Sequence, residues 1–443
     1  MKRIALTLIA ATAALVANAD TSKLPPQADV GPHPTLVAPV KSLVPTVKVA
    51  PAEPWPAGKT PTAAAGLQVT LAAADFQHPR WLHVLPNGDV LVAETNGPER
   101  PEDGKGVKGW AMKKAMKKAG AGPASANRIT LLRDADGDGK YEVRTVFLQG
   151  LTSPFGMALV GDQFYVANTD AVMAFPYKEG ATQLDLASGK KLTDLPAGPI
   201  NHHWTKSLIA SPDGSKLYAT VGSNSNVAEN GIEAEEGRAA VWEIDRASGE
   251  KRLFATGLRN PNGMAWITQG GKPVLWTVAN ERDELGSDLV PDYLTSVKDG
   301  AFYGWPYSYY GQHVDDRVKE QKPDLVARAI APDYALGAHV AALGLTAASG
   351  AVPAALSKAG DSGVFIGEHG SWNRQPFSGY KVVYLPFKDG TPQGLPVDVL
   401  TGFLGPKGQA WGRPVGVAMD KQGALLVADD VGNRIWRVTA PAK

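Results

Sequence analysis

Two adjacent histidines stand in the sequence Asn201-His202-His203-Trp204, just before an alternating apolar run. Imidazole titrates near neutral pH, so histidine is the side chain best suited to take a proton from a substrate. A histidine pair can also be structural, or it can ligate a metal if a third ligand converges on it. The pair is therefore a candidate general base, with the structural and metal-binding alternatives open.

Three arginines follow or precede runs that have the pattern of strands. Arg259 stands in Arg259-Asn260-Pro261-Asn262-Gly263, Arg374 ends the run that begins at Glu368-His369, and Arg413 precedes the last run. The guanidinium group is a planar fork that matches carboxylates. Three such cations at one place would repel each other without an anionic partner. If they converge, they predict a pocket for a polycarboxylate; for Arg259 a salt bridge within the fold is the alternative.

Two acidic segments have the composition of calcium sites. Asn280-Glu281-Arg282-Asp283-Glu284 offers clustered carboxylate and carbonyl oxygens, and a solvated charge run is the alternative. Asp134-Ala135-Asp136-Gly137-Asp138-Gly139 resembles the start of a calcium loop, but the distal glutamate expected there is missing. A hydrogen-bonded Asx turn is the alternative for this second segment. An aromatic cluster, Tyr303 to Tyr310, could stack on a planar ligand or pack between structural units.

One phrase recurs along the chain and indicates repeated structural units. It reads GLTSPFGMAL at residues 150–159, GLRNPNGMAW at 257–266 and, in a worn form, GRPVGVAM at 412–419. Self-similarity at this spacing is typical of repeated supersecondary units. Where the first copy has Thr152-Ser153, the second has Arg259-Asn260. A cation and an amide gained at one position of a repeat indicate a binding site.

A second pattern sets the number of repeats. Six alternating apolar runs end in small or polar residues, and five of them lead to a second run of the same kind. The six runs are Val90–Glu94, Phe164–Asn168, Leu217–Ser223, Val274–Asn280, Val364–Glu368 and Leu425–Asp429. Alternation with β-branched and aromatic residues predicts strands. We therefore predict an all-β, six-bladed β-propeller of four-stranded antiparallel blades. A pair of β-sandwich domains is the alternative, but it would not require the same strand ends six times.

The N-terminus predicts export. A basic start, an apolar run to Val16 and Ala17-Asn18-Ala19 have the form of a signal peptide over residues 1–19, which implies a periplasmic or secreted protein. Residues 20–66 are rich in Pro and Ala and predict a flexible linker, and residues 67–443 form the propeller domain. Without Lys2 and Arg3 the chain carries 43 basic and 44 acidic side chains, a balance that argues against nucleic acid as a partner. No later run is long enough to span a membrane.

Taken in order, these phrases resemble the soluble pyrroloquinoline quinone (PQQ) dehydrogenases of aldoses and glucose, and most closely their sorbosone dehydrogenase-like branch. The resemblance covers about Phe76 to Val438. Its phrases are His203 with Leu208 five residues on, RNPNG, the acidic strand end, YGWPY, GEHGSWNR and the arginine before the last blade. The resemblance implies a propeller that holds PQQ and Ca²⁺ over its axis.

The resemblance also implies roles for individual residues. His203 matches the general base, and Arg259, Asn260 and Arg413 match residues that contact the cofactor. The second arginine of the family is missing, because Val415 stands about where it would fall. A lysine of the family is replaced by His369 and the following insertion, in which Arg374 supplies the lost charge. The calcium ion of the family is bound by backbone carbonyls after the fourth strand, and the residues that match this place are Glu281, Asp283 and Glu284. Asp134, Asp136 and Asp138 are a separate candidate metal site.

The function implied is oxidation of an aldose, a sorbosone-like aldehyde or a related sugar alcohol group. Hydride would pass to the quinone, and electrons would then pass to an external acceptor such as a cytochrome or the quinone pool. A calcium-dependent sugar lactonase is the rival enzyme, and it would rely on axial carboxylates such as Glu94 and Glu281. A non-catalytic propeller that binds a peptide or glycan through its aromatic rim is the third possibility.

Overall fold

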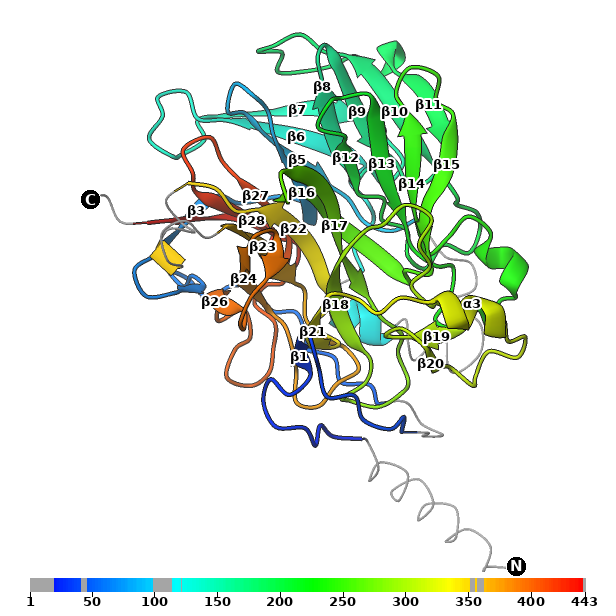
Figure 1. Ribbon diagram of the computed structural model, residues 1–443. Helices are drawn as coiled ribbons and strands as arrows, with labels where there is room; N and C mark the ends of the chain where they lie inside the picture. The colour runs from blue at the N-terminus through cyan, green and yellow to red at the C-terminus, as the bar shows by residue number, and fades with distance from the viewer. Residues whose placement is uncertain are drawn as a thin grey trace, which may run out of the picture.

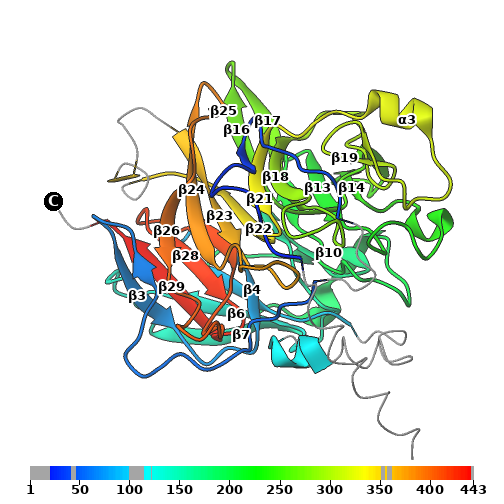
Figure 2. The same ribbon diagram turned by 90° about the horizontal axis from the view of Figure 1, so that it is seen from below.

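A computed structural model describes residues 20–40, 46–98, 114–120, 122–350, 355–356 and 362–440. Six sheets, each built on four antiparallel strands, are arranged around one axis (Figures 1 and 2). The first strand of each blade contacts the first strand of the next blade, and the ring closes between the sixth blade and the first. The chain is therefore a six-bladed β-propeller, and the predicted fold is confirmed.

The strands of the first three blades follow one another in the chain. Blade 1 has β4 (Pro79–Val84), β5 (Val90–Glu94), β6 (Arg128–Arg133) and β7 (Val143–Gln149). Blade 2 has β8 (Met157–Val160), β9 (Gln163–Ala167), β10 (Ala171–Pro176) and β11 (Lys190–Asp194). Blade 3 has β12 (Leu208–Ala210), β13 (Lys216–Val221), β14 (Ala240–Asp245) and β15 (Lys251–Thr256).

The other three blades include insertions and the closure of the ring. Blade 4 has β16 (Asn260–Gln269), β17 (Lys272–Asn280), β18 (Pro291–Ser296) and β21 (Tyr334–Ala338). Blade 5 has β22 (Ala342–Ala347), β23 (Ser362–Glu368), β24 (Lys381–Lys388) and β26 (Val397–Thr401), with β25 (Thr391–Pro392) paired to β24. Blade 6 has β27 (Pro414–Met419), β28 (Leu425–Asp429) and β29 (Arg434–Thr439), and its fourth strand is β3 (Gln68–Ala73). Pairing of the first propeller strand with the last joins the two ends of the chain.

The remaining elements are short and lie in connections. They are a hairpin of β19 (Ser308–Tyr309) and β20 (His313–Val314), the helix α3 (Pro323–Arg328), and the 3₁₀ turns η3 (Leu186–Ser188) and η4 (Ile232–Glu235). The hairpin and α3 belong to the insertion between β18 and β21 (Figure 1).

The recurring glycine of the repeat phrase allows neighbouring first strands to touch. A Cβ atom on Gly156 would lie 2.2 Å from the backbone nitrogen of Leu208, and one on Gly263 would lie 2.5 Å from that of Leu345. A Cβ atom on Gly416 would lie 2.7 Å from the carbonyl oxygen of Arg80, in blade 1. Because no side chain fits at these distances, glycine is required wherever two first strands approach through their backbones. The repeat phrase is thus a packing signal between blades.

Strand direction gives the propeller two distinct faces. The N face is the one at which first strands begin and second strands end; Pro79 pairs with Glu94 there, and Pro414 with Asp429. The C face carries the turns that join first strands to second strands and third strands to fourth strands. The N face lies at the bottom of Figure 1 and toward the viewer in Figure 2. Residues that follow a second strand therefore gather on one face with residues that precede a first strand.

The segment expected to be a flexible linker differs from that prediction in its described part. We call residues 20–40 and 46–66 the N-terminal arm. Its strand β1 (Val30–Gly31) pairs with β21, and its strand β2 (Thr62–Ala63) pairs with β26. Trp55 is 5% exposed and packs against Phe403 and Trp436. Composition predicted the absence of regular secondary structure here, but not the packing of an extended chain onto two blades.

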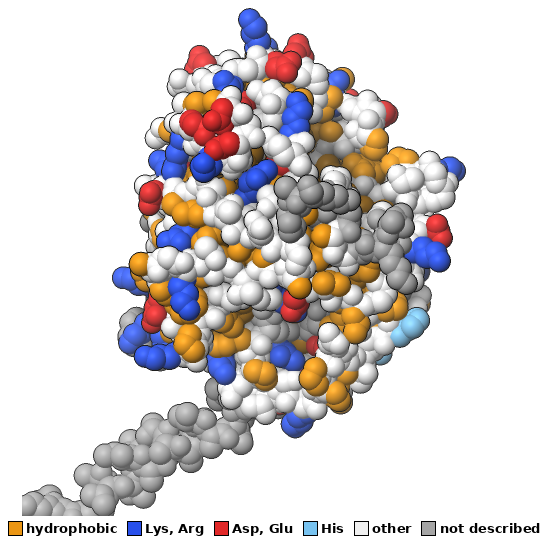
Figure 3. All heavy atoms as spheres, turned by 90° about the vertical axis from the view of Figure 1, so that its left-hand side faces the viewer, with side chains coloured by type: hydrophobic (Ala, Val, Ile, Leu, Met, Phe, Trp, Pro, Cys, Tyr) orange, Lys and Arg blue, Asp and Glu red, His pale blue; other side chains and the backbone are white. Residues whose placement is uncertain are grey.

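Other features of the described residues bear on partners. No helix among them is long and apolar enough to cross a membrane. Residues 1–19, the predicted signal peptide, lie outside the described part of the chain. On the face shown in Figure 3, acidic and basic side chains are interspersed apart from one compact acidic group.

Candidate functional site

His203 lies on the N face, in the segment that leads to β12. Its Nδ1 is 2.9 Å from the carbonyl oxygen of Ser223 and 2.9 Å from the hydroxyl oxygen of the same residue. That hydroxyl donates its own hydrogen to the carbonyl of Ser225 at 2.6 Å, so it can only accept from the imidazole. Both partners of Nδ1 are acceptors, and Nδ1 must therefore carry the proton. In the neutral ring the lone pair is then on Nε2, which gives His203 the tautomer of a general base.

A buried network fixes the segment that carries His203. The ammonium of Lys206 donates to the carbonyl of Trp204 at 3.2 Å, and the hydroxyl of Thr169 donates to the same carbonyl at 3.0 Å. Asn201 donates in turn to that hydroxyl at 2.8 Å. Burial lowers the pKa of Lys206 to about 7. The residues on either side of His203 are thus held by hydrogen bonds within blades 2 and 3.

Gly222 brings His203 and Asn260 together. A Cβ atom at Gly222 would lie 2.4 Å from Cβ of His203 and 2.5 Å from Oδ1 of Asn260. The amide nitrogen of Asn260 donates to Oδ1 of Asn280 at 3.3 Å, whereas its buried Oδ1 has no hydrogen-bond partner. A buried polar atom without a partner is uncommon in proteins and indicates a missing ligand or water. The imidazole and this unsatisfied amide oxygen pack against one glycine.

Arg259, the neighbour of Asn260, is fully engaged by protein groups. Its guanidinium donates to the carbonyl of Glu281 at 2.6 Å, to Oδ1 of Asn226 at 3.0 Å and to Oδ2 of Asp283 at 3.0 Å. The predicted alternative of an internal salt bridge is therefore what the structure contains. Arg259 contributes positive charge to the N face, but its carboxylate partner already balances that charge.

Arg413, which precedes β27, differs from Arg259 because some of its donors are not bonded. Its side chain is buried, and its Nε and Nη2 have no hydrogen-bond partner. The guanidinium carbon lies 5.0 Å from the ring centre of Tyr380, an aromatic face that supports a cation. No ion pair of Arg413 occurs among the described residues. Arg413 thus presents a buried positive charge and two donors that the protein itself leaves unused.

Arg80, which sequence reasoning did not select, lies beside Arg413. Its Nη1 donates to Oδ2 of Asp430 at 2.7 Å, and its Nε has no partner. Burial lowers the pKa of Arg80, and the like charge of Arg413 lowers it further, whereas Asp430 opposes both. The guanidinium also lies 5.9 Å from the ring centre of Trp204, next to His203. Arg80 therefore connects the arginine of blade 6 with the segment of the candidate base.

Asp430 is the centre of this buried group. His369 Nε2 lies 2.9 Å from Oδ2 of Asp430, and His78 Nε2 lies 3.5 Å from the same oxygen. Burial alone would raise the pKa of Asp430, but His369, His78 and Arg80 together hold it below its usual range. Burial lowers the pKa of His78 to about 4 and also lowers the pKa of His369. With both histidines neutral, two arginines face one carboxylate, and this group of side chains keeps an excess positive charge.

Arg374 does not join this group as a donor. It donates to the carbonyl of Ser287 at 2.9 Å, to that of Pro376 at 3.2 Å and to Oδ1 of Asp288 at 3.2 Å. A further bond of 3.0 Å runs to the hydroxyl of Ser22 in the N-terminal arm. Its guanidinium holds loops and the arm together. Of the three predicted arginines, only Arg413 offers unused donors.

The acidic end of β17 does not form a cluster of carboxylates. Glu281 is buried and accepts from Nε of Arg282 at 2.9 Å, while Glu284 is exposed. Asp283 is held by Arg259 and by Asn373, whose Nδ2 donates at 2.6 Å. The carbonyl of Glu281 accepts from Arg259. The carbonyl of Asp283 accepts from Nη1 of Arg317 at 2.8 Å. Two guanidinium groups stand where the predicted calcium ion would need oxygen ligands.

The carboxylate that the lactonase alternative needs is also engaged. Glu94 is fully buried and accepts from Arg128 at 2.9 and 2.7 Å through both oxygens. The aromatic cluster of the insertion is packing, since its members are all at most 8% exposed: Tyr303, Trp305, Tyr307, Tyr309 and Tyr310. Neither feature supports the rival functions.

The second acidic segment lies on the C face, between β6 and β7. The carboxylates of Asp134, Asp136 and Asp138 meet there with that of Glu142, and their oxygens all lie within 4.8 Å of one another. Glu142 takes part although the glutamate expected further along is missing. The aspartates also cap backbone N–H groups, as an Asx turn does; Gly137 donates to Asp134 at 2.7 Å. This segment is at the opposite end of the propeller from His203 and Arg413.

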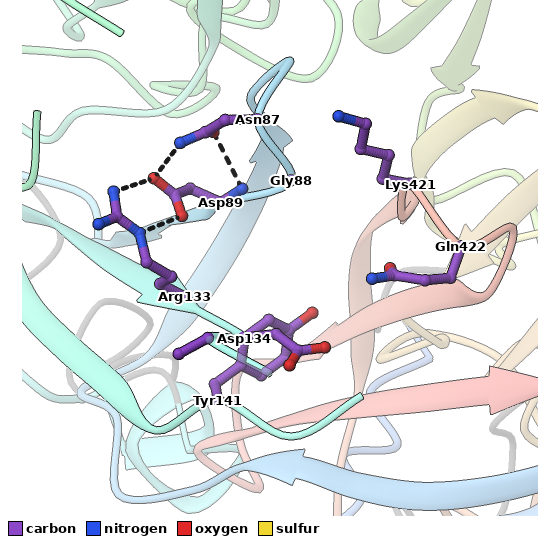
Figure 4. Close-up of a pocket in the computed structure, with 9 residues that line it drawn as sticks. Asn87, Gly88, Asp89, Arg133, Asp134, Tyr141, Lys421 and Gln422 are labelled. Atoms are coloured by element: carbon purple, nitrogen blue, oxygen red, sulfur yellow. Dashed lines mark hydrogen bonds and ion pairs between the residues drawn. The ribbon is translucent and has the colours of Figure 1, made fainter. Parts of the chain in front are cut away.

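A pocket beside this segment is built from turns of blades 1 and 6. Figure 4 shows Asp89 held by Arg133 and Asn87 on one side of it, with Lys421 on another. Asp89 and Arg133 form an ion pair at the rim of this pocket. We find no buried unsatisfied atom among its lining residues.

The repeat phrase contained a signal for Arg80. The proline of the repeat recurs as Pro79, Pro154, Pro261 and Pro414, and the residues on either side of it lie at the start of the first strand. In the first blade these flanking residues are His78 and Arg80. Comparing the flanks of every copy would have selected both. Asp430 carries no such signal, because it only follows a second strand as many polar residues do.

The sequence matches a family described as TrAA12-like over residues 61–293 and 310–441, which is most of the chain. The chain belongs to the TrAA12-like family. A relative from Borreliella burgdorferi, described as an uncharacterized protein, is 26% identical over 297 residues, which are 65% of this chain and 76% of that protein.

Solved structures share the fold of this TrAA12-like chain. One is that of Carbohydrate-Active Enzymes Family AA12 from Trichoderma reesei, in an iodide structure (TM-score 0.68, 18% identity, 89% of this chain and 99% of that one). Another is the holo form of the pyranose dehydrogenase PQQ domain from Coprinopsis cinerea (TM-score 0.67, 19% identity, 88% of this chain and 100% of that one). A third is the PQQ-bound aldose sugar dehydrogenase from Streptomyces coelicolor (TM-score 0.52, 17% identity, 86% of this chain and 99% of that one). The sorbosone-like branch stays a prediction.

Proposed function

We propose that the chain is a quinoprotein sugar dehydrogenase that binds PQQ on the N face and oxidises an aldose, a sorbosone-like aldehyde or a related sugar alcohol group. Membership of the TrAA12-like family and the PQQ named for two proteins of the same fold support the proposal. The observation that carries it is the pair of Arg413 and Arg80, two cations that have three buried nitrogens without a hydrogen-bond partner and only one neighbouring carboxylate, Asp430, among the described residues. An uncompensated buried charge is costly, so a ligand carboxylate is the natural partner.

The residues present fit the cofactor chemically. PQQ is a planar tricarboxylate, and Arg413, Arg80 and His369 offer cationic and neutral donors within one buried group. Arg80 takes the place of the second family arginine that is missing at Val415. The unsatisfied Oδ1 of Asn260 can accept from an N–H group of a ligand. When bound, PQQ supplies an ortho-quinone, which accepts the hydride of the substrate.

His203 is the general base in this proposal. Its Nε2 takes the proton of the substrate hydroxyl, because Nδ1–H is held by the two acceptor oxygens of Ser223. The bonds to Trp204 and the packing against Gly222 keep the ring in place. General-base assistance of this kind contributes about 10²- to 10⁴-fold to a rate.

Calcium does not fit the predicted place on the N face. A divalent cation there would lie against the guanidinium groups of Arg259 and Arg317, which already bond to the carbonyls in question. We therefore assign the ion no part in the reaction. The group of Asp134, Asp136 and Asp138 stays a separate predicted metal site on the C face. Export by the predicted signal peptide would place the enzyme in the periplasm or outside the cell, where an external acceptor receives the electrons.

Titration of the purified protein with PQQ tests the proposal. We expect stoichiometric quinone absorbance and reduction of a dye in the presence of sugars. His203→Ala should lose about 10²- to 10⁴-fold in turnover and still bind PQQ, whereas the matched variant His202→Ala should keep most of its turnover. Hydrolysis of sugar lactones without dye reduction would favour the lactonase. Absence of PQQ binding would refute the proposal.

A further inference from the structure

The N-terminal arm crosses the N face and is bonded to loops of three blades (Figure 2). The amide of Val40 donates to the carbonyl of Leu285 at 2.9 Å, which belongs to the loop after β17. The amide of Lys48 donates to the carbonyl of Trp372 at 2.8 Å, in the loop after β23. The arm also exchanges backbone bonds with Ala410, just before β27. These loops are the ones that carry Asp283, Asn373 and Arg413.

One end of the arm reaches Arg413 through a buried carboxylate. The indole Nε1 of Trp55 donates to Oδ2 of Asp429 at 2.8 Å, and Trp436 donates to the same oxygen at 3.1 Å. The other oxygen accepts the backbone N–H of Arg413 at 2.8 Å and that of Gly432 at 2.8 Å. No cation pairs with Asp429 in the described part of the chain. Its orientation depends on four N–H donors, and one of them belongs to the arm.

The other end of the arm reaches Arg259 by a similar route. The hydroxyl of Ser22 donates to Asp288 at 2.5 Å, and the backbone N–H of Lys23 donates to it at 2.6 Å. Asp288 and Ser22 both bind the guanidinium of Arg374. The residue before Arg374 is Asn373, which donates to the same Asp283 that holds Arg259. A second carboxylate thus transmits the position of the arm to Arg259, whose neighbour Asn260 carries the unsatisfied oxygen of the site.

We propose that the N-terminal arm sets the positions of Arg413 and of the adjacent residues Arg259 and Asn260, with Trp55 and Ser22 as positioning residues of the cofactor site. The inference rests on the proposed function. An arm that only covered the blades would need apolar contacts and backbone pairing, which β1 and β2 already supply. The polar side chains at its two ends instead bond to carboxylates: Asp429 binds the backbone of Arg413 directly, and Asp288 is linked to Arg259 through Arg374, Asn373 and Asp283. Loss of these bonds should therefore weaken cofactor binding more than it weakens the fold.

Trp55→Phe in the full-length protein is the sharpest test. Phenylalanine removes the indole N–H but keeps a ring against Phe403 and Trp436. The matched control is Trp266→Phe, whose Nε1 donates to the carbonyl of Ala210 at 2.7 Å between blades 3 and 4. Each variant loses one indole hydrogen bond, so both should lower the melting temperature, Trp55→Phe by more because its acceptor is a carboxylate.

The two variants should differ in PQQ affinity, measured by absorbance titration at equilibrium. We expect Trp55→Phe to raise the Kd for PQQ about tenfold, since the lost bond is to a charged group, and Trp266→Phe to leave it within about twofold. At saturating PQQ the KM for the sugar should not change. Equal Kd values for both variants, with normal wild-type binding, would overturn the inference and leave the proposed function standing.

Ser22→Ala provides a second, milder test in case Trp55→Phe does not fold. Its control is Ser248→Ala, because Ser248 donates to Asp245 at 3.0 Å in a turn on the C face. Ser22→Ala should raise the Kd for PQQ about threefold or more, as expected for loss of part of one hydrogen bond, and Ser248→Ala should not. A Kd unchanged in Ser22→Ala would overturn the inference. A wild-type protein that does not bind PQQ would refute the proposed function and this inference together.

Discussion

Replacing Arg413 with methionine should change stability and cofactor affinity in opposite directions. Two nitrogens of Arg413 are buried without partners, and each unsatisfied buried donor costs about 1–3 kcal/mol. Methionine keeps the apolar stem and its contact with Tyr380 but removes the donors and the charge beside Arg80. Replacing buried ionic groups with apolar ones is often neutral or stabilises by about 1–4 kcal/mol. We therefore expect the free energy of unfolding of the protein without cofactor to rise by an amount in that range.

The same substitution should weaken PQQ binding. Loss of one partner of a buried charge pair costs about 2–5 kcal/mol, which corresponds to at least about a thirtyfold increase in Kd. Denaturant unfolding without PQQ and absorbance titration with PQQ measure the two effects separately. Arg259→Met is the matched control, because that guanidinium is fully bonded and its loss leaves Asp283 without a cation. The control should lose stability where Arg413→Met gains it.

One result would refute the reasoning. If Arg413→Met destabilises the protein as Arg259→Met does and leaves the Kd for PQQ unchanged, Arg413 is a structural residue and its unused nitrogens have another explanation. A gain in stability with unchanged PQQ affinity would show that the unpaired charge of Arg413 serves a ligand other than PQQ.

Two further predictions concern other residues of the N face and its surroundings. Gly222→Ala should separate His203 from Asn260, because a Cβ atom would lie 2.4–2.5 Å from both. Turnover should fall at least about tenfold, as for misplaced catalytic groups. Turnover equal to that of the wild type, with an unchanged circular dichroism spectrum, would contradict the geometry. Glu368 is fully buried with one unbonded oxygen, and burial raises its pKa to about 8 from 4.5. A pKa raised in the folded state means that the stabilisation is present below the unfolded value and is lost as pH rises toward 8. The wild type should therefore lose stability relative to Glu368→Gln, by up to roughly 1.4 kcal/mol per pH unit between about 5 and 8, and parallel pH profiles in denaturant unfolding would show that Glu368 is not the group responsible.

Much of the fold follows from local pattern, since the strands show as alternating apolar and polar residues in the sequence. The six predicted runs coincide with β5, β9, β13, β17, β23 and β28. The propeller then follows because the glycines of the repeat are required where the backbones of neighbouring first strands touch, as at Gly156 and Gly263. By contrast, composition gave no indication that Trp55 is a core residue. An isolated tryptophan in a proline-rich segment has no periodicity, and only its contacts with Phe403 and Trp436 in the folded chain show its role.

The candidate site was partly predictable for the same reason. His203, Arg413 and Asn260 stand beside the starts of first strands, and strand direction brings such positions to one face. Whether a guanidinium is used or unused could not be read from the sequence. Arg259 and Arg374 have the same chemistry as Arg413, yet their partners Asp283 and Asp288 come from loops whose paths depend on the insertions around them.

The sequence by itself determined the all-β class, the number of blades and the face on which imidazole and arginine gather, because alternation and repeated glycines are properties of neighbouring residues. Only the tertiary structure decided which charges are neutralised. It placed Asp283 against Arg259, left Arg413 beside Arg80 with unused donors, and moved the aspartates of residues 134–138 to the opposite end of the molecule. Electrostatic pairing acts over a few ångströms in space, whereas the paired residues are 24 positions apart in the chain for Arg259 and Asp283 and 350 for Arg80 and Asp430.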